Sequence, residues 1–366
     1  MRIDMSSKWR PLIGNLTAIA VAAIVVGISA TECAAFGPRG HAKVGAISDA
    51  LLKGTPTAMK LAALLDGMSL TDAALLADTI KSSDTHPDHF HLAGHPRIQQ
   101  ELRDFLKANK VGSAFNHHDF HYTDVPVEGS SKYHPGSVGR SDHDVVNMIS
   151  YCIKVLNGTE PPTNARKITT SVAVIMLAHY IGDIHQPLHV GAEYFDSTGS
   201  TVNPDTAGTG IPDKGGDGLT LVLLHPAGVA GNLHSYWDAK AVDGAFDLYI
   251  SQIVMSGGTD TTDKGITSFL AGKTPGGTLT STTPIEKWSE EWANEMLPTA
   301  RAAHGKLKFS NVVIHGTTTK QATAVATERP PGSGSPSYAE FAAQTTALNI
   351  HRAGWRLKIV LETVLP

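Results

Sequence analysis

The run His179-Tyr-Ile-Gly-Asp-Ile-His-Gln-Pro-Leu-His189 holds the densest group of chemically reactive side chains in this sequence. Residues four positions apart share one face of a helix, so a helix that ends near Asp183 would allow His179 and Asp183 to bind the same ion. Pro187 would then turn the chain and leave His189 to point elsewhere. The run therefore predicts a helix that carries part of a metal site.

A second pair with the same spacing follows at His234-Ser-Tyr-Trp-Asp238. Imidazole and carboxylate ligands without a thiolate suit zinc. Two such pairs and a nearby third histidine predict a site with more than one zinc ion.

Helical periodicity dominates the remainder of the chain. Four stretches place apolar residues at intervals of three and four positions, whereas alternating strand patterns are scarce. Three further stretches are rich in Gly, Ser, Thr and Pro and are interpreted as long surface loops, with one short β-hairpin around Gly218–Leu224. We therefore expect an all-α fold. The helical stretches are Ser141–Leu156, Lys167–Asp183, Ile285–Ala303 and Tyr338–Leu365, and the loops are Tyr194–Thr220, Ser256–Pro284 and His304–Ser337.

Residues 1–35 have the pattern of a removable export signal. Basic residues precede an apolar run from Leu12 to Ala30, and small residues offer a cleavage point before Phe36. No later apolar stretch approaches the roughly 20 residues that span a bilayer. The sequence predicts an exported mature chain, residues 36–366, that is soluble, has no membrane anchor and folds as a single domain.

The charge of the chain argues against one kind of binding surface, and its cysteine content argues against disulfide cross-links. The net charge of −4 argues against a basic nucleic-acid-binding footprint. Cys33 lies in the predicted signal and Cys152 stands alone, so the mature chain has no intramolecular disulfide. All 18 histidines follow the signal, and their spacing decides which of them are candidate ligands.

These blocks and several shorter motifs resemble the zinc-dependent single-strand-specific nucleases, a family of secreted nucleases related to the bacterial zinc-dependent phospholipases C. The motifs occur in the family's order and span nearly the whole mature chain. The two histidine and aspartate blocks are the specific part of the resemblance. The other pieces are Phe36-Gly-Pro-Arg-Gly-His41, Leu76-Ala-Asp78-Thr-Ile-Lys81, His121-Tyr-Thr-Asp124, Gly215-Gly-Asp217, Asn232-Leu-His234, Trp288-Ser-Glu-Glu-Trp292 and Arg352-Ala-Gly-Trp-Arg-Leu357.

The resemblance implies a cluster of three zinc ions. The third ion would use the free amino nitrogen and carbonyl oxygen of Phe36, which gives removal of the signal a chemical meaning. Phe36 replaces the family's usual tryptophan, but only its backbone would ligate. The implied ligand sets are Asp78, His121, His179 and Asp183 for the first ion; His189, His234 and Asp238 for the second; and Phe36, His41 and the bridging Asp183 for the third.

The implied chemistry is phosphodiester hydrolysis. Two adjacent zinc ions can lower the pKa of a shared water from about 16 to near 7, and the third can stabilise the departing oxygen. Three aspartates neutralise only half the charge of three dications, so an acidic protein can still attract phosphate. Asp183, as the bridging ligand, and Lys81 are the expected catalytic residues.

Three further residues have roles implied by the family and simpler alternatives. Lys81 takes the place of the family's arginine as a phosphate contact, and the alternative is a solvated lysine on a helix face. Tyr122 and Asp124 would bind a nucleotide base, by stacking and by accepting from its amino edge. The alternative is core packing for Tyr122 and a turn for Asp124.

Other histidines and aromatics need separate interpretation. His117 and His118 precede His121 and could compete for its role, although His121 matches the family motif better. An insertion relative to the family contains four histidines and is either a polar loop or an extra metal site. By helical geometry, His185 points away from His179, and we expect it to support the ligands through a hydrogen bond. The insertion histidines are His86, His89, His91 and His95, and the aromatic residues expected in the core are Trp288, Trp292 and Trp355.

The sequence thus predicts an exported zinc phosphodiesterase acting on single-stranded DNA, RNA or nucleotides, with no stable protein partner. The products would carry 5′-phosphates, and 3′-nucleotidase activity would accompany endonuclease activity. A zinc-dependent phospholipase C is the nearest alternative, although Asp238 stands where those lipases tend to have glutamate. A non-catalytic zinc-binding protein is the second alternative.

Overall fold

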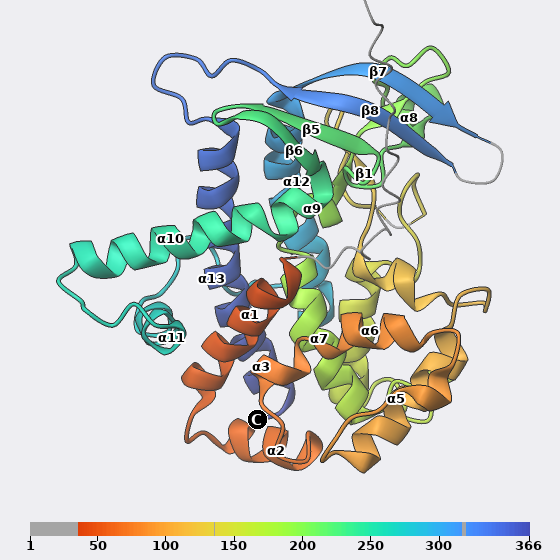
Figure 1. Ribbon diagram of the computed structural model, residues 1–366. Helices are drawn as coiled ribbons and strands as arrows, with labels where there is room; N and C mark the ends of the chain where they lie inside the picture. The colour runs from red at the N-terminus through yellow and green to blue at the C-terminus, as the bar shows by residue number, and fades with distance from the viewer. Residues whose placement is uncertain (1–35, 135, 317–319) are drawn as a thin grey trace, which may run out of the picture. The chain divides into compact units, whose positions relative to one another are not determined.

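Helices account for most of the computed structural model, which describes residues 36–134, 136–316 and 320–366 (Figure 1). The predicted export signal lies outside these residues. The expectation of a mainly helical fold is confirmed. The helices are α1 (Gly37–Leu52), α2 (Pro56–Leu64), α3 (Leu70–Ala73), α4 (Leu76–Thr79), α5 (Pro96–Asn109), α6 (Val145–Leu156), α7 (Thr170–Asp183), α8 (Pro204–Ala207), α9 (Leu233–Asp238), α10 (Lys240–Met255), α11 (Asp263–Ala271), α12 (Trp288–Gly305) and α13 (Tyr338–Val364). The 3₁₀ turns are η1 (Ile80–Ser83), η2 (Pro87–His89), η3 (His117–His121), η4 (Pro187–His189) and η5 (Ile285–Lys287).

Helix α7 is the buried centre of the helical part. Its sequence is apolar on nearly every side, and such a helix must pack on all faces. Every residue from Ser171 to Asp183 is buried, and α7 contacts α1, α3, α4, α5, α6 and α13. Thr169 begins the helix by accepting a hydrogen bond from the Val172 backbone N–H. The His179–His189 run therefore starts on a helix that is buried on nearly every side.

All four predicted helices are present, with small differences at their ends. Capping side chains set two of the starts, because they satisfy the free N–H groups of the first turn. Asp144 accepts from the Asn147 N–H and α6 begins one residue later, while Thr169 delays the start of α7 beyond Lys167. The third predicted helix divides into η5 and α12.

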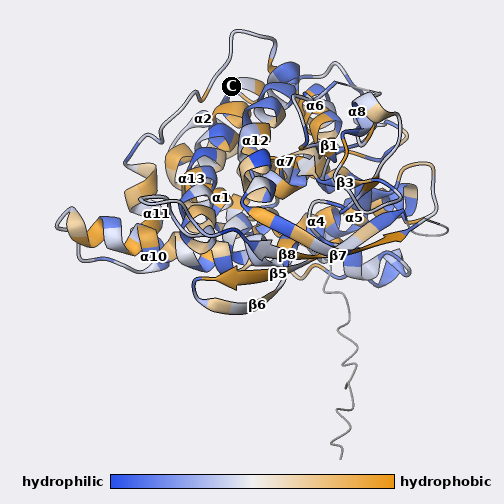
Figure 2. Cartoon of the chain, turned by 90° about the horizontal axis from the view of Figure 1, so that it is seen from above, coloured by the Kyte–Doolittle hydropathy of each residue, from blue (hydrophilic) through white to orange (hydrophobic). Residues whose placement is uncertain are grey.

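A four-stranded sheet is the main departure from the predicted fold. Its strand order is β6-β5-β8-β7. The predicted hairpin is present as an antiparallel pair of β5 (Leu219–Leu224) and β6 (Ala227–Asn232), and Figure 2 colours much of β5 as hydrophobic. Strand β5 also pairs in parallel with β8 (Gln321–Glu328), which pairs antiparallel with β7 (Leu307–His315).

The prediction that His304–Ser337 is a surface loop is therefore wrong. Strand β8 alternates partly buried and buried residues along Gln-Ala-Thr-Ala-Val-Ala-Thr-Glu. Its buried positions are mostly alanines, so the period of two carries little apolar contrast. The predicted loop Ser256–Pro284 likewise contains α11, which Thr262 caps. The predicted loop Tyr194–Thr220 contains α8 and two short paired strands, β3 (Tyr194–Phe195) and β4 (Ile211–Pro212).

One short parallel pair of strands holds two segments of the site together. Strands β1 (Val125–Pro126) and β2 (Gly191–Ala192) lie side by side, and the Thr123 N–H donates to the His189 carbonyl at 2.8 Å. These contacts hold the segment after His121 against the segment after His189.

Helices from opposite ends of the described chain pack together. Helix α1 contacts α13, where the Ser48 hydroxyl donates to the Gly354 carbonyl at 2.7 Å. Trp288 and Trp292 are buried in the helical core as predicted, and Trp355 is partly buried against it. Within the described residues, no helix has the length and apolar character needed to cross a membrane.

Candidate metal centre

The eight side chains predicted as metal ligands fall into three groups, and within each group the ligand atoms lie within 4.8 Å of one another. The side chains come from α1, α4, η3, α7, η4 and α9. Residue His179 belongs to two groups, so the first two are contiguous. The groups are His41 with Asp78 and His179; His121 with His179 and Asp183; and His189 with His234 and Asp238.

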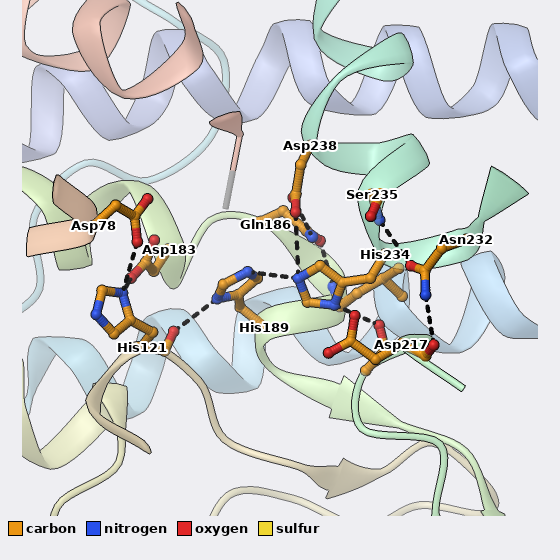
Figure 3. Close-up of polar contacts among 12 residues, drawn as sticks. Asp78, His121, Asp183, Gln186, His189, Asp217, Asn232, His234, Ser235 and Asp238 are labelled. Carbon is orange, nitrogen blue, oxygen red and sulfur yellow. Dashed lines mark hydrogen bonds and ion pairs between the residues drawn. The ribbon is translucent and has the colours of Figure 1, made fainter. Parts of the chain in front are cut away.

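The Asp183 carboxylate is fully buried and joins residues from three elements. Its Oδ1 lies 3.2 Å from His41 Nε2 and 3.3 Å from His179 Nε2. Its Oδ2 lies 3.0 Å from His121 Nδ1, a contact visible in Figure 3. A carboxylate within reach of three imidazoles is placed to bridge cations, which is the role that the family resemblance implies.

Asp78 faces the same two groups from α4. Its Oδ1 lies 3.6 Å from His179 Nε2 and 3.8 Å from His121 Nδ1. The same oxygen lies 2.8 Å from Lys81 Nζ. This carboxylate thus contacts both the imidazole cluster and a lysine.

The third group lies at α9 and η4. His234 and Asp238 are four positions apart on α9, and His234 Nε2 lies 3.5 Å from Asp238 Oδ2. His189 Nε2 lies only 2.8 Å from His234 Nε2. Two imidazole nitrogens this close must share a proton or a metal ion between them.

Backbone carbonyls orient three of the rings. A carbonyl oxygen only accepts, so each Nδ1 that contacts one carries the proton and leaves its lone pair on Nε2, which faces the site. The sequence pattern does not show these acceptors, because they are backbone atoms. The contacts are His179 Nδ1 to Ala74 at 2.7 Å, His189 Nδ1 to His121 at 2.7 Å and His234 Nδ1 to Gly215 at 2.8 Å.

The donor set fits a bound metal. His41 Nδ1 and His121 Nε2 are buried and have no hydrogen-bond partner among the described residues. Burial lowers the pKa of His179 to about 3, so its ring is neutral and able to ligate. Burial raises the pKa of Asp183 to about 7, and His41 only partly offsets this. Nearby dications would stabilise the ionised carboxylate and use the free nitrogens.

Two glycines permit this close packing. Gly215 has φ +59°, and a Cβ there would lie 2.1 Å from the Leu188 carbonyl oxygen. Only glycine fits, and the Gly215 carbonyl is the one that holds His234. A Cβ on Gly182 would lie 2.7 Å from His41 Nδ1, so α1 can approach α7 closely at this point.

Phe36 lies at the start of α1. Its side chain is buried and its carbonyl accepts a hydrogen bond from the Gly40 N–H at 3.0 Å. A Cβ on Gly37 would lie 2.6 Å from the Asp238 carbonyl oxygen, which places this end of α1 beside the third group. Ligation by the Phe36 amine stays a prediction.

Lys81 is buried in η1, with its side chain only 6% exposed. The alternative of a solvated lysine on a helix face is therefore wrong. A buried ammonium needs a charged partner, and Asp78 provides one. Contact between Lys81 and a phosphate stays a prediction.

Tyr122 and Asp124 directly follow η3, whose last residue is His121. Tyr122 is partly buried, and its hydroxyl donates to Asp119 Oδ1 at 3.1 Å. Asp124 Oδ1 is buried and has no hydrogen-bond partner among the described residues. Burial, reinforced by Asp213, raises the pKa of Asp124 to about 7. The unsatisfied oxygen is available to a ligand, although base binding stays a prediction.

His185 does not support a ligand side chain in the way the sequence suggests. Its Nδ1 contacts the Ile181 carbonyl at 2.7 Å and its Nε2 contacts Arg356 Nη1 at 2.8 Å. The neighbouring Gln186 has that role, because its Nε2 donates to Asp238 Oδ1 at 3.1 Å (Figure 3). Gln186 was not among the residues predicted from the sequence, although it lies inside the His179–His189 run.

The structure shows which of the remaining histidines lie in the three metal groups and which lie outside them. His121 lies within the metal groups, whereas His117 and His118 lie outside all three and form a separate cluster with Asp84. The insertion histidines take part in no ligand group among the described residues. His86, His89 and His91 are exposed and His95 is partly exposed, as expected of a polar loop.

Fold and site together define a helical protein whose buried histidines and aspartates form groups that could hold metal ions. The chain matches the family model S1/P1 Nuclease over residues 36–366. It therefore belongs to the S1/P1 nuclease family, and the resemblance drawn from the sequence is confirmed.

Individual relatives are distant and match only in part. Endonuclease 5 of Arabidopsis thaliana is 26% identical over 102 residues, covering 28% of this chain and 27% of the relative. Endonuclease 2 of the same plant is 27% identical over 153 residues, covering 40% of this chain and 45% of the relative. The aligned parts thus span less than half the length of either relative.

Proposed function

We propose that this chain is an exported zinc-dependent nuclease that hydrolyses single-stranded DNA and RNA to 5′-phosphorylated products and has 3′-nucleotidase activity. One observation carries the proposal: side chains from six separate elements converge as three histidine and aspartate groups in a member of the S1/P1 nuclease family. The names of the plant relatives, all endonucleases, support a nucleic-acid substrate.

Zinc is the proposed metal, with three ions held by the predicted ligands. The donors are neutral imidazoles and carboxylates without thiolates, which zinc accepts. When bound, such ions activate water as a nucleophile and stabilise the negative charge of a phosphoryl group and its leaving oxygen. Asp183 would hold two ions because it contacts His41, His121 and His179 at once.

Lys81 supplies a fixed positive charge beside the metal groups. Its ammonium is buried and pairs with Asp78, so its position is defined before substrate binds. We assign to it a contact with a phosphate oxygen that strengthens as charge accumulates there. No proton transfer from Lys81 is required.

Tyr122 and Asp124 would select nucleic acid over lipid. A partly exposed aromatic ring can stack on any base, and a buried carboxylate with a free oxygen can accept from a base amino group. A phosphocholine head group offers neither a ring to stack nor an amino edge to read. These two residues favour the nuclease over the phospholipase C alternative.

Removal of residues 1–35 would complete the site. Before cleavage, the Phe36 nitrogen belongs to an amide, whose delocalised lone pair cannot ligate as an amine can. The predicted ligands should hold three zinc ions in a protein that starts at Phe36, and about two in one with extra residues before Phe36. Full activity of an extended form, confirmed by mass spectrometry to be uncut, would contradict this role.

The deciding experiment compares substrates on the zinc-loaded protein that begins at Phe36. We expect cleavage of a single-stranded oligonucleotide to 5′-phosphorylated fragments, much slower cleavage of the matched duplex, and no activity in a His234→Ala control. Hydrolysis of phosphatidylcholine without oligonucleotide cleavage would identify a phospholipase C. Zinc binding with no hydrolysis of either substrate would identify a zinc-binding protein.

A further inference from the structure

A fourth cluster of ligating side chains lies apart from the three metal groups. Asp84, His117 and His118 place their ligand atoms within 4.8 Å of one another. His117 Nε2 lies 3.0 Å from Asp84 Oδ1, and His118 Nε2 lies 4.0 Å from Asp84 Oδ2. Asp84 directly follows η1, and the two histidines open η3.

Packing holds these donors in place. His117 is 1% exposed and Asp84 is 9% exposed. The His117 ring packs edge-on against Phe105, with ring centroids 6.1 Å apart, and the Val111 N–H donates to Asp84 Oδ2 at 3.1 Å. Because both partners are fixed by the surrounding fold, little ordering would be needed to bind an ion.

The protein alone leaves one donor of this cluster unsatisfied. His118 Nε2 is buried and has no hydrogen-bond partner among residues 36–134, 136–316 and 320–366. The nearest Asp84 oxygen, at 4.0 Å, is beyond hydrogen-bond distance. A cation between the three side chains would use this nitrogen together with the Asp84 carboxylate.

We propose that Asp84, His117 and His118 bind a further divalent ion of the zinc type. Two imidazoles and one carboxylate form a ligand set that zinc accepts, with the fourth position left to water. The proposal does not depend on nuclease activity, because it rests only on these three side chains.

The site would connect the turn that carries Lys81 with the turn that supplies the ligand His121. Lys81 lies in η1, and Asp84 follows the end of that turn. His121 ends η3, and His117 begins it. An ion at the fourth cluster would tie η1 to η3 and fix the spacing between Lys81 and His121.

The first test uses the wild-type protein with zinc and diffraction data collected at the zinc absorption edge. We expect an anomalous peak between Asp84, His117 and His118, in addition to those at the three groups. Peaks at the three groups alone, or a fourth peak only in millimolar excess zinc, would overturn the proposal.

The second test measures zinc content after His118→Ala. His118 is the most exposed of the three donors, with 27% of its side chain accessible, so its truncation should be tolerated. We expect one zinc fewer per chain than wild type. The matched control is His91→Ala, an exposed histidine outside every ligand group of the described residues. Unchanged zinc in His118→Ala, or equal loss in His91→Ala, would overturn the proposal; if His118→Ala does not fold, the diffraction result decides.

Discussion

Replacing Gln186 with methionine removes a side chain that positions two proposed zinc ligands without binding zinc itself. The Gln186 Nε2 donates to Asp238 Oδ1 at 3.1 Å. Its Oε1 accepts from the Leu188 N–H at 2.6 Å, which caps η4 and orients the following His189. Methionine has nearly the same volume, so the core stays filled while both hydrogen bonds are lost.

The expected loss of zinc affinity follows from the removal of two hydrogen bonds that orient the ligands of one ion. Partners that orient a metal ligand typically contribute roughly 10- to 100-fold in metal affinity, or about 1.4 to 2.7 kcal/mol. We therefore expect the dissociation constant of the ion bound by the third group to rise by that factor. The other proposed ions should keep their affinity, because neither contact of Gln186 reaches Asp78 or Asp183.

The assay is a competition titration with a zinc chelator, on protein whose circular dichroism matches wild type. His185→Gln is the matched control, because His185 lies in the same motif and is equally buried but contacts Ile181 and Arg356 instead of a ligand. Wild-type zinc affinity in a folded Gln186→Met protein would refute the reasoning. An equal loss in His185→Gln would show that burial, and not the contact to Asp238, sets the affinity.

Four further predictions concern stability, catalysis, binding and pH. Chelation should lower the melting temperature by several degrees, since an ion at about a thousandfold excess over its Kd stabilises the native state by about 4 kcal/mol; an unchanged calorimetric transition after complete metal removal would contradict this. Lys81→Met should lower kcat/KM for oligonucleotides by roughly 10- to 100-fold, the cost of one charge-assisted hydrogen bond, while Lys81→Arg should retain most activity; equal losses would argue against a phosphate contact. Tyr122→Ala should raise KM for nucleotides by an amount equivalent to about 1 to 3 kcal/mol but leave KM for a baseless phosphodiester unchanged, and parallel losses would favour a packing role. Because the pKa of Asp124 is raised to about 7, its carboxylate is ionised only above that pH, so KM for bases with an amino edge should rise as pH falls from 8 to 6; Asp124→Asn should abolish that dependence, and a wild-type KM that is flat over this range would refute it.

Local spacing accounts for what the sequence could predict. His179 and Asp183 are four positions apart on one helix, so their joint orientation follows from helical geometry alone. The pair His234 and Asp238 repeats the same geometry on α9. The long apolar patterns of α6, α7, α12 and α13 were equally readable, because their periodicity is strong.

Long-range contacts account for the features that the sequence could not predict. The parallel pairing of β5 with β8 aligns Leu219 with Ala324, a contact between distant segments that no local pattern specifies. The carbonyls of Ala74 and Gly215 orient two histidines, but a backbone acceptor leaves no signature in residue type. Gln186 is a different case. It lies beside Pro187 within the His179–His189 run, so a supporting role for it could have been predicted.

The packing of α1 on α13 has a consequence for the order in which the molecule matures. His41 lies on α1, among the first described residues, yet the surface that α1 covers includes Gly354 on the last helix. A ribosome must therefore finish almost the whole chain before His41 can take its final position, and closing so large a loop slows folding. If His41 binds a metal ion as proposed, that ion can be taken up only after the chain is nearly complete. The proposed third ion would then depend on the metal available where the completed chain folds.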